Sequence, residues 1–157
     1  MDRSRLKRFV DQRLVELPLD APVFVAPYTP VREAVAVMQG GGHSCVLAGT
    51  GDRVVGIFTE RDVLLKCMDD DFDWSQRLDA AVLTREPRMI ALTGTVAEAI
   101  ATMQQHQYRT LPVVDGSCVV GLVRLGNLLA QFAEAFPEDV LNLPPRPHQV
   151  METPEGG

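Results

Sequence analysis

Residues 56–62 read Gly-Ile-Phe-Thr-Glu-Arg-Asp, a run that ends one apolar strand and opens one helix. An altered copy, Gly-Leu-Val-Arg-Leu-Gly-Asn, follows 65 positions later at residues 121–127. The same offset relates matching residues before the run, among them Pro22 and Pro87, Val31 and Val96, Glu33 and Glu98, and Met38 and Met103. Self-similarity at a fixed offset indicates a repeated structural unit. The chain is therefore one unit written twice.

Each copy carries the same order of apolar periodicities. In the first copy they predict a strand over residues 23–26, a helix from about Thr29, a hairpin over 44–58 and a helix over 60–68. The second copy repeats this order, with a hairpin over 110–123 and a helix over 127–136. The sequence thus predicts an α/β fold of two β-α-β-β-α units. The first two strands of a unit are joined through a helix and are expected to pair in parallel, whereas the hairpin strands pair antiparallel.

The regions outside the repeat differ from it in composition. Leu6, Phe9, Val10, Leu14 and Leu17 are spaced as on one face of a helix, with basic residues between them. The expected division is an N-terminal amphipathic helix (1–17), a first unit (18–68), an acidic linker (69–78), a second unit (79–136) and a Pro-rich tail (137–157). The tail is expected to be extended or without regular structure unless it docks on a partner.

The net charge and the cysteines limit the partners and the cellular compartment that we expect for this protein. The 157 residues carry a formal net charge of −6, which opposes binding to the phosphates of nucleic acid. The cysteines Cys45, Cys67 and Cys118 form no CxxC and leave an odd number, which favours a reducing compartment. The apolar runs are too short to cross a bilayer, and no apolar signal core follows the charged start. We therefore expect a cytoplasmic protein with no membrane or nucleic-acid partner.

Two stretches resemble phosphate-binding or metal-binding motifs, but the residues around them do not support such a site. The glycines at 40–42 lack the strand before and helix after that a phosphate-binding loop requires, and they read as a helix end. The aspartates at 69–71 and 73 lack the spaced ligands and turn glycine of a calcium loop, so a solvated linker is favoured over a metal site. No metal ligand is assigned from the sequence.

Thr59 and Asp62 support both a structural and a functional interpretation. Their spacing fits a capping box at the start of a helix, with Asp in place of the usual Glu. The same helix start presents free N–H groups and a positive dipole end, which suit a phosphate. A carboxylate one turn into the helix can accept both hydroxyls of a ribose.

The chain resembles a tandem pair of cystathionine-β-synthase (CBS) domains, also called a Bateman module. The resemblance covers about residues 18–136 and rests on the repeat, the run at 56–62, and Tyr-Arg-Thr-Leu-Pro-Val-Val-Asp at 108–115. It implies two units related by a pseudo-twofold axis with two clefts between them. In many members these clefts bind AMP, ADP, ATP or S-adenosylmethionine. The modules are usually regulatory, of a type found as stand-alone bacterial proteins, and commonly form a disc-shaped homodimer through their helices.

The resemblance assigns the site residues. Thr59 is expected near a phosphate, Asp62 on the ribose, and Arg109 at a phosphate through its guanidinium group. The base is expected near the first strand of a unit, at residues 22–25 or 84–89, which includes Thr84. These positions make up the expected adenosine site.

This sequence departs from the family pattern in both copies. Arg124 and Asn127 replace the Thr and Asp of the motif in the second copy. Asn127 can still hydrogen-bond a ribose, and Arg124 could serve a phosphate or form a surface salt bridge. In the first copy the Leu-Pro-Val-Val-Asp strand is replaced by residues 45–48. The cleft of Thr59 and Asp62 is thus the better candidate.

The sequence predicts no enzyme, because His43, His106 and His148 are scattered and no Ser or Cys pairs with a His in a recognisable order. No catalytic residue and no required cofactor are assigned. The expected function is a regulatory homodimer that binds an adenine nucleotide and signals through dimer contacts or an unidentified regulated protein. The alternative is a ligand-free dimerisation or scaffold module that binds a partner protein.

Overall fold

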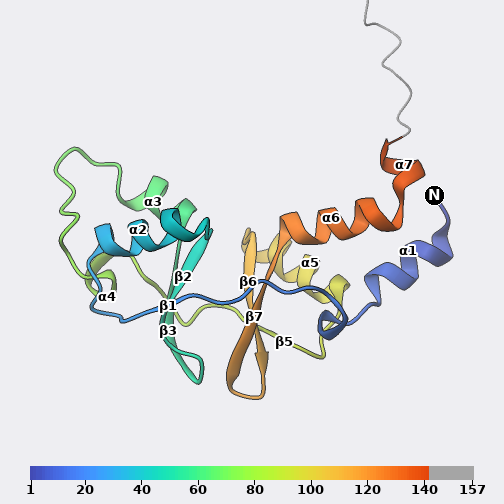
Figure 1. Cartoon of the computed structure of the whole chain (residues 1–157), viewed down its shortest axis with the longest axis horizontal. Helices are drawn as coiled ribbons and strands as arrows, with labels where there is room; N and C mark the ends of the chain where they lie inside the picture. The colour runs from blue at the N-terminus through green and yellow to red at the C-terminus, as the bar shows by residue number, and fades with distance from the viewer. Residues whose placement is uncertain (142–157) are drawn as a thin grey trace, which may run out of the picture.

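The computed structural model describes residues 1–141 and contains two small sheets that lie side by side (Figure 1). The first sheet has the strand order β1-β2-β3-β4, with β1 Phe24–Val25, β2 Cys45–Thr50, β3 Arg53–Thr59 and β4 Thr84–Arg85. The second has the order β5-β6-β7, with β5 Ile90–Ala91, β6 Thr110–Asp115 and β7 Cys118–Arg124. The helices are α1 Arg3–Val10, α2 Val31–Gly41, α3 Glu60–Lys66, α4 Leu78–Ala81, α5 Val96–His106, α6 Leu125–Ala135 and α7 Pro137–Leu141.

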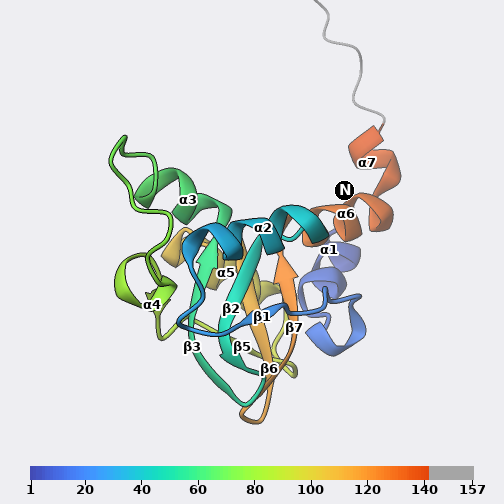
Figure 2. The ribbon, with the colours of Figure 1, turned by 60° about the vertical axis from the view of Figure 1, so that its left-hand side comes forward.

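The predicted pairing within each unit is confirmed. β1 runs parallel to β2 and β5 runs parallel to β6, whereas each hairpin is antiparallel. The hairpin registers shift between Ala48 and Gly49 in one unit and between Val113 and Val114 in the other, positions that the repeat offset relates. Figure 2 shows that both hairpin turns point away from the side that carries α2, α3 and α6. The two units therefore share one architecture, including the position of this register shift.

The N-terminal helix is shorter than the apolar spacing predicted. α1 ends at Val10, and a single 3₁₀ turn, η1 Leu14–Glu16, follows it. The backbone N–H groups of Leu14 and Val15 donate to the carbonyl oxygens of Gly94 and Leu92. Because these donors are committed to another segment, they cannot continue the hydrogen bonds of a helix. The apolar residues at 14 and 17 face the same core as Phe9 without belonging to the same helix.

The stretches expected to be linker and tail are partly structured. The rings of Phe72 and Trp74 stack edge to face with their centroids 5.0 Å apart, and both pack on the buried apolar residues of the first unit. The acidic linker is therefore not solvated throughout. At the C-terminal side, residues 137–141 form α7 instead of extended chain. Pro137 takes the first helical position, where its missing N–H costs nothing, and Glu138 and Asp139 favour the positive end of the helix dipole. The remainder of the Pro-rich tail lies outside the described residues.

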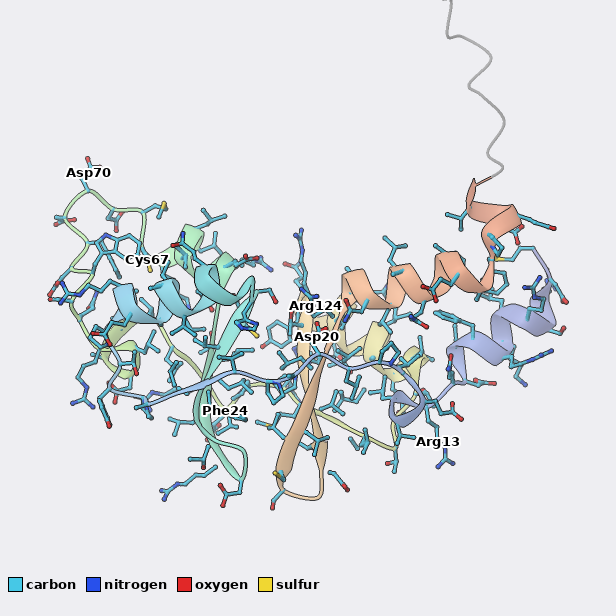
Figure 3. All side chains as sticks on the ribbon, viewed as in Figure 1. Arg13, Asp20, Phe24, Cys67, Asp70 and Arg124 are labelled. Carbon is cyan, nitrogen blue, oxygen red and sulfur yellow. The ribbon has the colours of Figure 1, made fainter. Side chains whose placement is uncertain are left out.

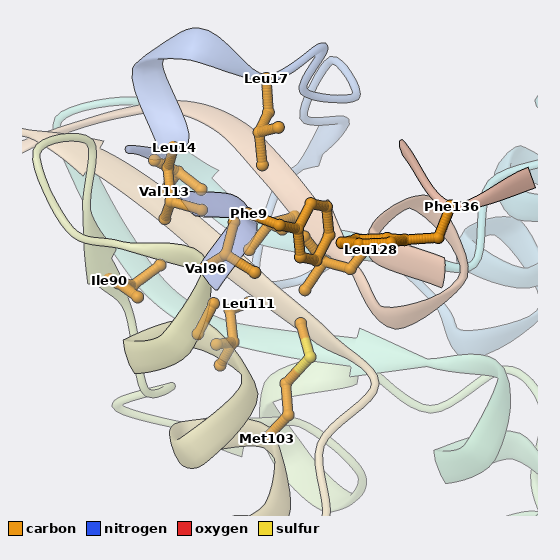
Figure 4. Close-up of a cluster of buried hydrophobic side chains, with 12 residues drawn as sticks. Phe9, Leu14, Leu17, Ile90, Val96, Met103, Leu111, Val113, Leu128 and Phe136 are labelled. Carbon is orange, nitrogen blue, oxygen red and sulfur yellow. The ribbon is translucent and has the colours of Figure 1, made fainter. Parts of the chain in front are cut away.

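Each unit receives part of its core from the segment that precedes the other unit. We call residues 14–20 the first lead-in segment and residues 78–85 the second. The buried Leu14 and Leu17 of the first lead-in segment pack in the core of the second unit, with Val96, Leu111 and Val113 (Figure 4). Reciprocally, Leu78 and Val82 of the second lead-in segment pack in the core of the first unit, which is built from Val31, Ala34, Met38, Val46, Phe58 and Cys67. The two lead-in segments are thus exchanged.

Two glycines allow the exchanged segments to lie directly on the strands. A Cβ at Gly56 of β3 would stand 2.6 Å from the carbonyl oxygen of Thr84, and one at Gly121 of β7 would stand 2.9 Å from Cβ of Leu19. These distances are too short for a side chain. The repeat offset relates the two glycines, so the close approach is a property of both units. Between the sheets, a third apolar cluster of Cys45, Leu47, Ile57, Val119 and Leu122 joins the units.

Within residues 1–141, none of the helices combines the length and the apolar character needed to span a bilayer.

Candidate functional site

Thr59 and Asp62 form the capping box that the sequence predicted at the start of α3. The Thr59 N–H donates to Asp62 Oδ2 at 2.9 Å, and the Asp62 N–H donates to Thr59 Oγ1 at 3.2 Å. The Thr59 hydroxyl also donates to Asp62 Oδ2, at 3.0 Å. The structural interpretation of this pair is therefore confirmed. It does not exclude ligand binding, because an ionised carboxylate has about four acceptor positions.

Lys66 adds a cation to this pair and connects it to the second lead-in segment. Its Nζ lies 2.8 Å from Asp62 Oδ1, and it donates to the Val82 carbonyl oxygen at 2.9 Å and to Thr84 Oγ1 at 3.3 Å. The Asp62 side chain is only 13% exposed, whereas the Lys66 side chain is 36% exposed. We call Thr59, Asp62, Lys66 and Thr84 the first cluster. The structure thus brings together three of the predicted site residues around a lysine that the sequence did not single out.

A second cluster stands at the equivalent place in the other unit and consists of Asp20, Arg124 and Asn127. Arg124 Nε forms an ion pair with Asp20 Oδ2, and Asn127 Nδ2 donates to the same oxygen at 3.1 Å. Arg124 Nη2 also donates to Asn127 Oδ1 at 3.4 Å. Figure 3 shows Asp20 and Arg124 together near the middle of the molecule, where the first lead-in segment crosses β7. The predicted residues Arg124 and Asn127 are therefore neighbours, joined by Asp20.

The sequence did not indicate Asp20 as a site residue, although it predicted the counterpart Thr84. Asp20 pairs with Leu122 as Thr84 pairs with Ile57, the residue 65 positions before Leu122. The two lead-in segments are related by an offset of 64 residues instead of 65. The Leu14 N–H donates to the Gly94 carbonyl oxygen, and the Leu78 N–H, 64 residues later, donates to the carbonyl oxygen of Thr29, the repeat counterpart of Gly94. Aligning the lead-in segments with their own offset would have identified Asp20.

Arg109 lies at the second cluster through its backbone. Its carbonyl oxygen accepts a hydrogen bond from the Leu125 N–H at 2.9 Å, just as the Ser44 carbonyl oxygen accepts from Glu60 in the first unit. The Arg109 side chain is exposed. Across residues 1–141, no hydrogen bond or ion pair joins that side chain to Thr59 or Asp62. Its assignment to a phosphate stays a prediction.

The thiols near the first cluster are held in their neutral form. Cys45 pairs with Thr59 across the hairpin, and burial raises the pKa of its thiol to about 11. Burial, and then the Asp62 carboxylate, also raise the pKa of Cys67 above its ordinary value. A thiol attacks as the thiolate, so neither group is a ready nucleophile at neutral pH.

Other features of the described chain lie away from both clusters. An open hollow of about 810 Å³ lies between α1 and the end of α6, lined by Arg5, Arg8, Phe9, Asp11, Gln12, Glu16, Ala135 and Phe136. None of the cluster residues lines it. Within residues 1–141, no three His, Cys, Asp or Glu side chains gather closely enough to hold a metal ion.

The family model of the CBS domain matches the chain twice, over residues 14–69 and 80–134. Among curated relatives, the CBS domain-containing protein YhcV of Bacillus subtilis is 28% identical over 66% of this chain and 74% of its own length. The chain spans only 16% of the length of a plant relative from Arabidopsis thaliana and of a yeast relative from Schizosaccharomyces pombe.

Solved structures share this fold. The CBS domain protein PAE2072 of Pyrobaculum aerophilum, complexed with AMP, is 20% identical with a TM-score of 0.68, covering 78% of this chain and 99% of its own. The CBS domain pair of protein MJ0100, in complex with 5′-methylthioadenosine and S-adenosylmethionine, is 17% identical with a TM-score of 0.69. That match covers 78% of this chain and 97% of the other. At these identities the likeness concerns the fold.

Proposed function

The chain belongs to the CBS domain family, and from that premise we propose that it is a regulatory protein that binds an adenosine-containing ligand at the first cluster. The observation that carries this function is the position of Asp62, a carboxylate fixed at the start of α3 by Thr59 and Lys66. Three donors occupy part of its acceptor capacity, which leaves room for a ribose hydroxyl. The AMP and S-adenosylmethionine complexes of the two structural neighbours support this ligand class.

Lys66 and Thr84 complete the chemistry of this site. The ammonium group of Lys66 supplies positive charge beside Asp62, and the Thr84 hydroxyl brings a polar group from the second lead-in segment. A ligand that contacts Asp62 and Thr84 together would bridge α3 and a segment exchanged between the units. Ligand binding would then favour one arrangement of the units through its different contacts in each. This is the route by which the protein would report its ligand.

The surface of α3 and α6 supports assembly of a homodimer. Leu64 and Leu129 occupy equivalent positions of the repeat and are 67% and 65% exposed. Leu65, Met68 and Leu125 extend this apolar surface. The two helices lie on the same side of the molecule (Figure 2). Exposed apolar side chains gathered on one side suit burial against a second copy. This surface also favours the second candidate function, a scaffold module that holds a partner protein without a ligand.

The role is proposed to be non-catalytic, with binding as its only chemistry. The regulated partner protein and the cytoplasmic location stay predictions from the sequence.

Isothermal titration of the full chain with AMP, ADP, ATP and S-adenosylmethionine tests the proposed function. At least one ligand is expected to bind. Asp62→Ala is expected to lower the affinity for that ligand by about tenfold or more, because it removes a hydrogen bond to a charged group. Glu98→Ala is the matched control, because Glu98 caps α5 in a box with Thr95 as Asp62 caps α3. Folded, ligand-free protein that gives no heat with any of the four would favour the scaffold function instead.

A further inference from the structure

The two clusters place their carboxylate on opposite elements. In the first cluster the acid, Asp62, is on the helix, and the lead-in segment contributes the neutral Thr84. In the second cluster the helix contributes the neutral Asn127, and the acid, Asp20, is on the lead-in segment. The negative charge therefore lies on the helix in one cluster and on the lead-in segment in the other, so a ligand meets different groups at the two clusters.

The start of α6 attracts anions more strongly than the start of α3. The first turn of α3 contains Glu60 and Asp62, and Thr59 caps it. The first turn of α6 contains no acid, its N-cap residue Arg124 makes no capping hydrogen bond, and Arg124 is itself a cation. An uncapped helix start next to a guanidinium group favours a negative charge. In this structure that charge is the carboxylate of Asp20.

The backbone of Asp20 is held in place by hydrogen bonds that do not involve its carboxylate. Its N–H donates to the Leu122 carbonyl oxygen at 3.0 Å, and its own carbonyl oxygen accepts from Leu122 at 2.9 Å. The neighbouring Leu17 is buried in the second core. Because the segment is fixed independently, the ion pair with Arg124 is not needed to anchor it. The carboxylate, whose Oδ2 contacts both Arg124 and Asn127, therefore lies where an anion approaching Arg124 would meet it.

The ion pair is partly exposed to solvent, although the Arg124 Nε atom within it is buried. The side chains of Asp20 and Arg124 are each 38% exposed. An exposed ion pair contributes little to stability, so a soluble anion can exchange with one partner. An approaching phosphate would meet the like charge of Asp20 beside the guanidinium group that attracts it, whereas an uncharged nucleoside would not.

We propose that Asp20 is a specificity-determining residue of the second cluster, which disfavours ligands that carry a phosphate and admits nucleosides that lack one. This inference rests on the proposed function and extends it, since it takes the second cluster to bind an adenosine-containing ligand as the first is proposed to do. The second cluster would then accept an uncharged or cationic adenosine compound and disfavour its phosphorylated counterpart.

A nuclear magnetic resonance titration tests this inference at each cluster separately. The amide signals of Gly126 and Asn127 report on the second cluster, and those of Glu60 and Arg61 report on the first. The isotopically labelled full chain is titrated with inorganic phosphate, AMP and adenosine. The variants are Asp20→Asn, which keeps the shape, and Asp20→Thr, which installs the hydroxyl found at position 84. Asp20→Asn/Arg124→Gln is the control that removes the cation.

At the second cluster, each single variant is expected to bind AMP and inorganic phosphate about fivefold more tightly or better than the wild type. Its affinity for adenosine is expected to change by less than about twofold. The control is expected to lose that gain. Unchanged phosphate and AMP affinity at Gly126 in a folded single variant would overturn the inference, as would an equal gain for adenosine. If AMP and adenosine shift neither cluster, the proposed function fails. A phosphate shift at Gly126 confined to the single variants would still support the role of Asp20.

Discussion

Lys66 Nζ lies 2.8 Å from Asp62 Oδ1, so one lysine neutralises the carboxylate proposed to hold the ribose. The same ammonium group donates to Val82 and Thr84 on the second lead-in segment. The site residue and the exchanged segment are therefore coupled through a single side chain. A change at the ligand position would be felt by the segment that completes the first core.

Lys66→Met is expected to lower the free energy of unfolding by about 1 kcal/mol or less at low salt, because the lysine is partly exposed. The matched control is Arg77→Met, which removes the exposed Arg77–Asp79 ion pair. Its effect is expected to be smaller, since the Arg77 side chain is 59% exposed, against 36% for Lys66, and Arg85 remains a second cation near Asp79. Chemical denaturation at two salt concentrations measures both. An Arg77→Met effect equal to or larger than that of Lys66→Met would contradict the coupling.

Leu78→Ala and Leu14→Ala test the exchange of the lead-in segments. Both leucines are fully buried, so each substitution is expected to cost about 2–5 kcal/mol. Hydrogen exchange should show where the loss falls. Leu78→Ala should loosen α2 and β2 of the first unit, and Leu14→Ala should loosen α5 and β6 of the second. Faster exchange in the unit that follows each leucine in sequence would refute the exchange.

Leu64→Glu and Leu129→Glu test the proposed dimer surface. Each places a charge on the exposed apolar side of α3 or α6, and each is expected to shift the protein towards the monomer. Sedimentation at several concentrations measures the change. Val120→Glu is the control, because Val120 is also exposed but lies on β7. Wild-type protein that is monomeric at all concentrations would remove the homodimer from the proposed function.

The buried thiol of Cys45 predicts how stability depends on pH. Its pKa is raised from 9.0 to about 11 in the folded state, so above about pH 9 the unfolded chain loses a proton that the folded chain keeps. Stability is therefore expected to fall between pH 9 and 11, by an amount on the order of 2 kcal/mol. Relative to wild type, Cys45→Ala should flatten this fall, whereas the exposed Cys118→Ala should not. Identical slopes in all three proteins would contradict the prediction.

The architecture was predictable because it depends on local patterns written twice. The apolar spacing of α2 and α5, the hairpin turns and the capping box of Thr59 and Asp62 are all short-range features. The exchange of lead-in segments was not predictable, because it depends on pairings such as that of Asn127 with Asp20, which are 107 positions apart. The end of α1 at Val10 was missed for the same reason, since distant carbonyl groups take up the backbone donors of Leu14 and Val15.

Part of the candidate site followed from the sequence as well. Thr59, Asp62 and Thr84 gather in the first cluster, and Arg124 and Asn127 gather in the second. Lys66 and Asp20 were missed because neither lies at a position to which the resemblance assigns a ligand contact. Their importance comes from contacts across the exchanged segments. The direction of the Arg109 side chain could not be deduced, since an exposed side chain is set by weak and distributed interactions.

The exchanged lead-in segments also set an order in which the protein can be completed during synthesis. The ribosome makes Leu14 and Leu17 first, but their partners in the second core, such as Val113 and Leu128, are made about a hundred residues later. The first core can close once Leu78 and Val82 have emerged. The stretch around Leu14 and Leu17 therefore keeps its apolar side chains uncovered until the second unit has been synthesised. Contacts between residues so distant in the chain slow folding, and a chaperone that shields this stretch would act on the nascent protein.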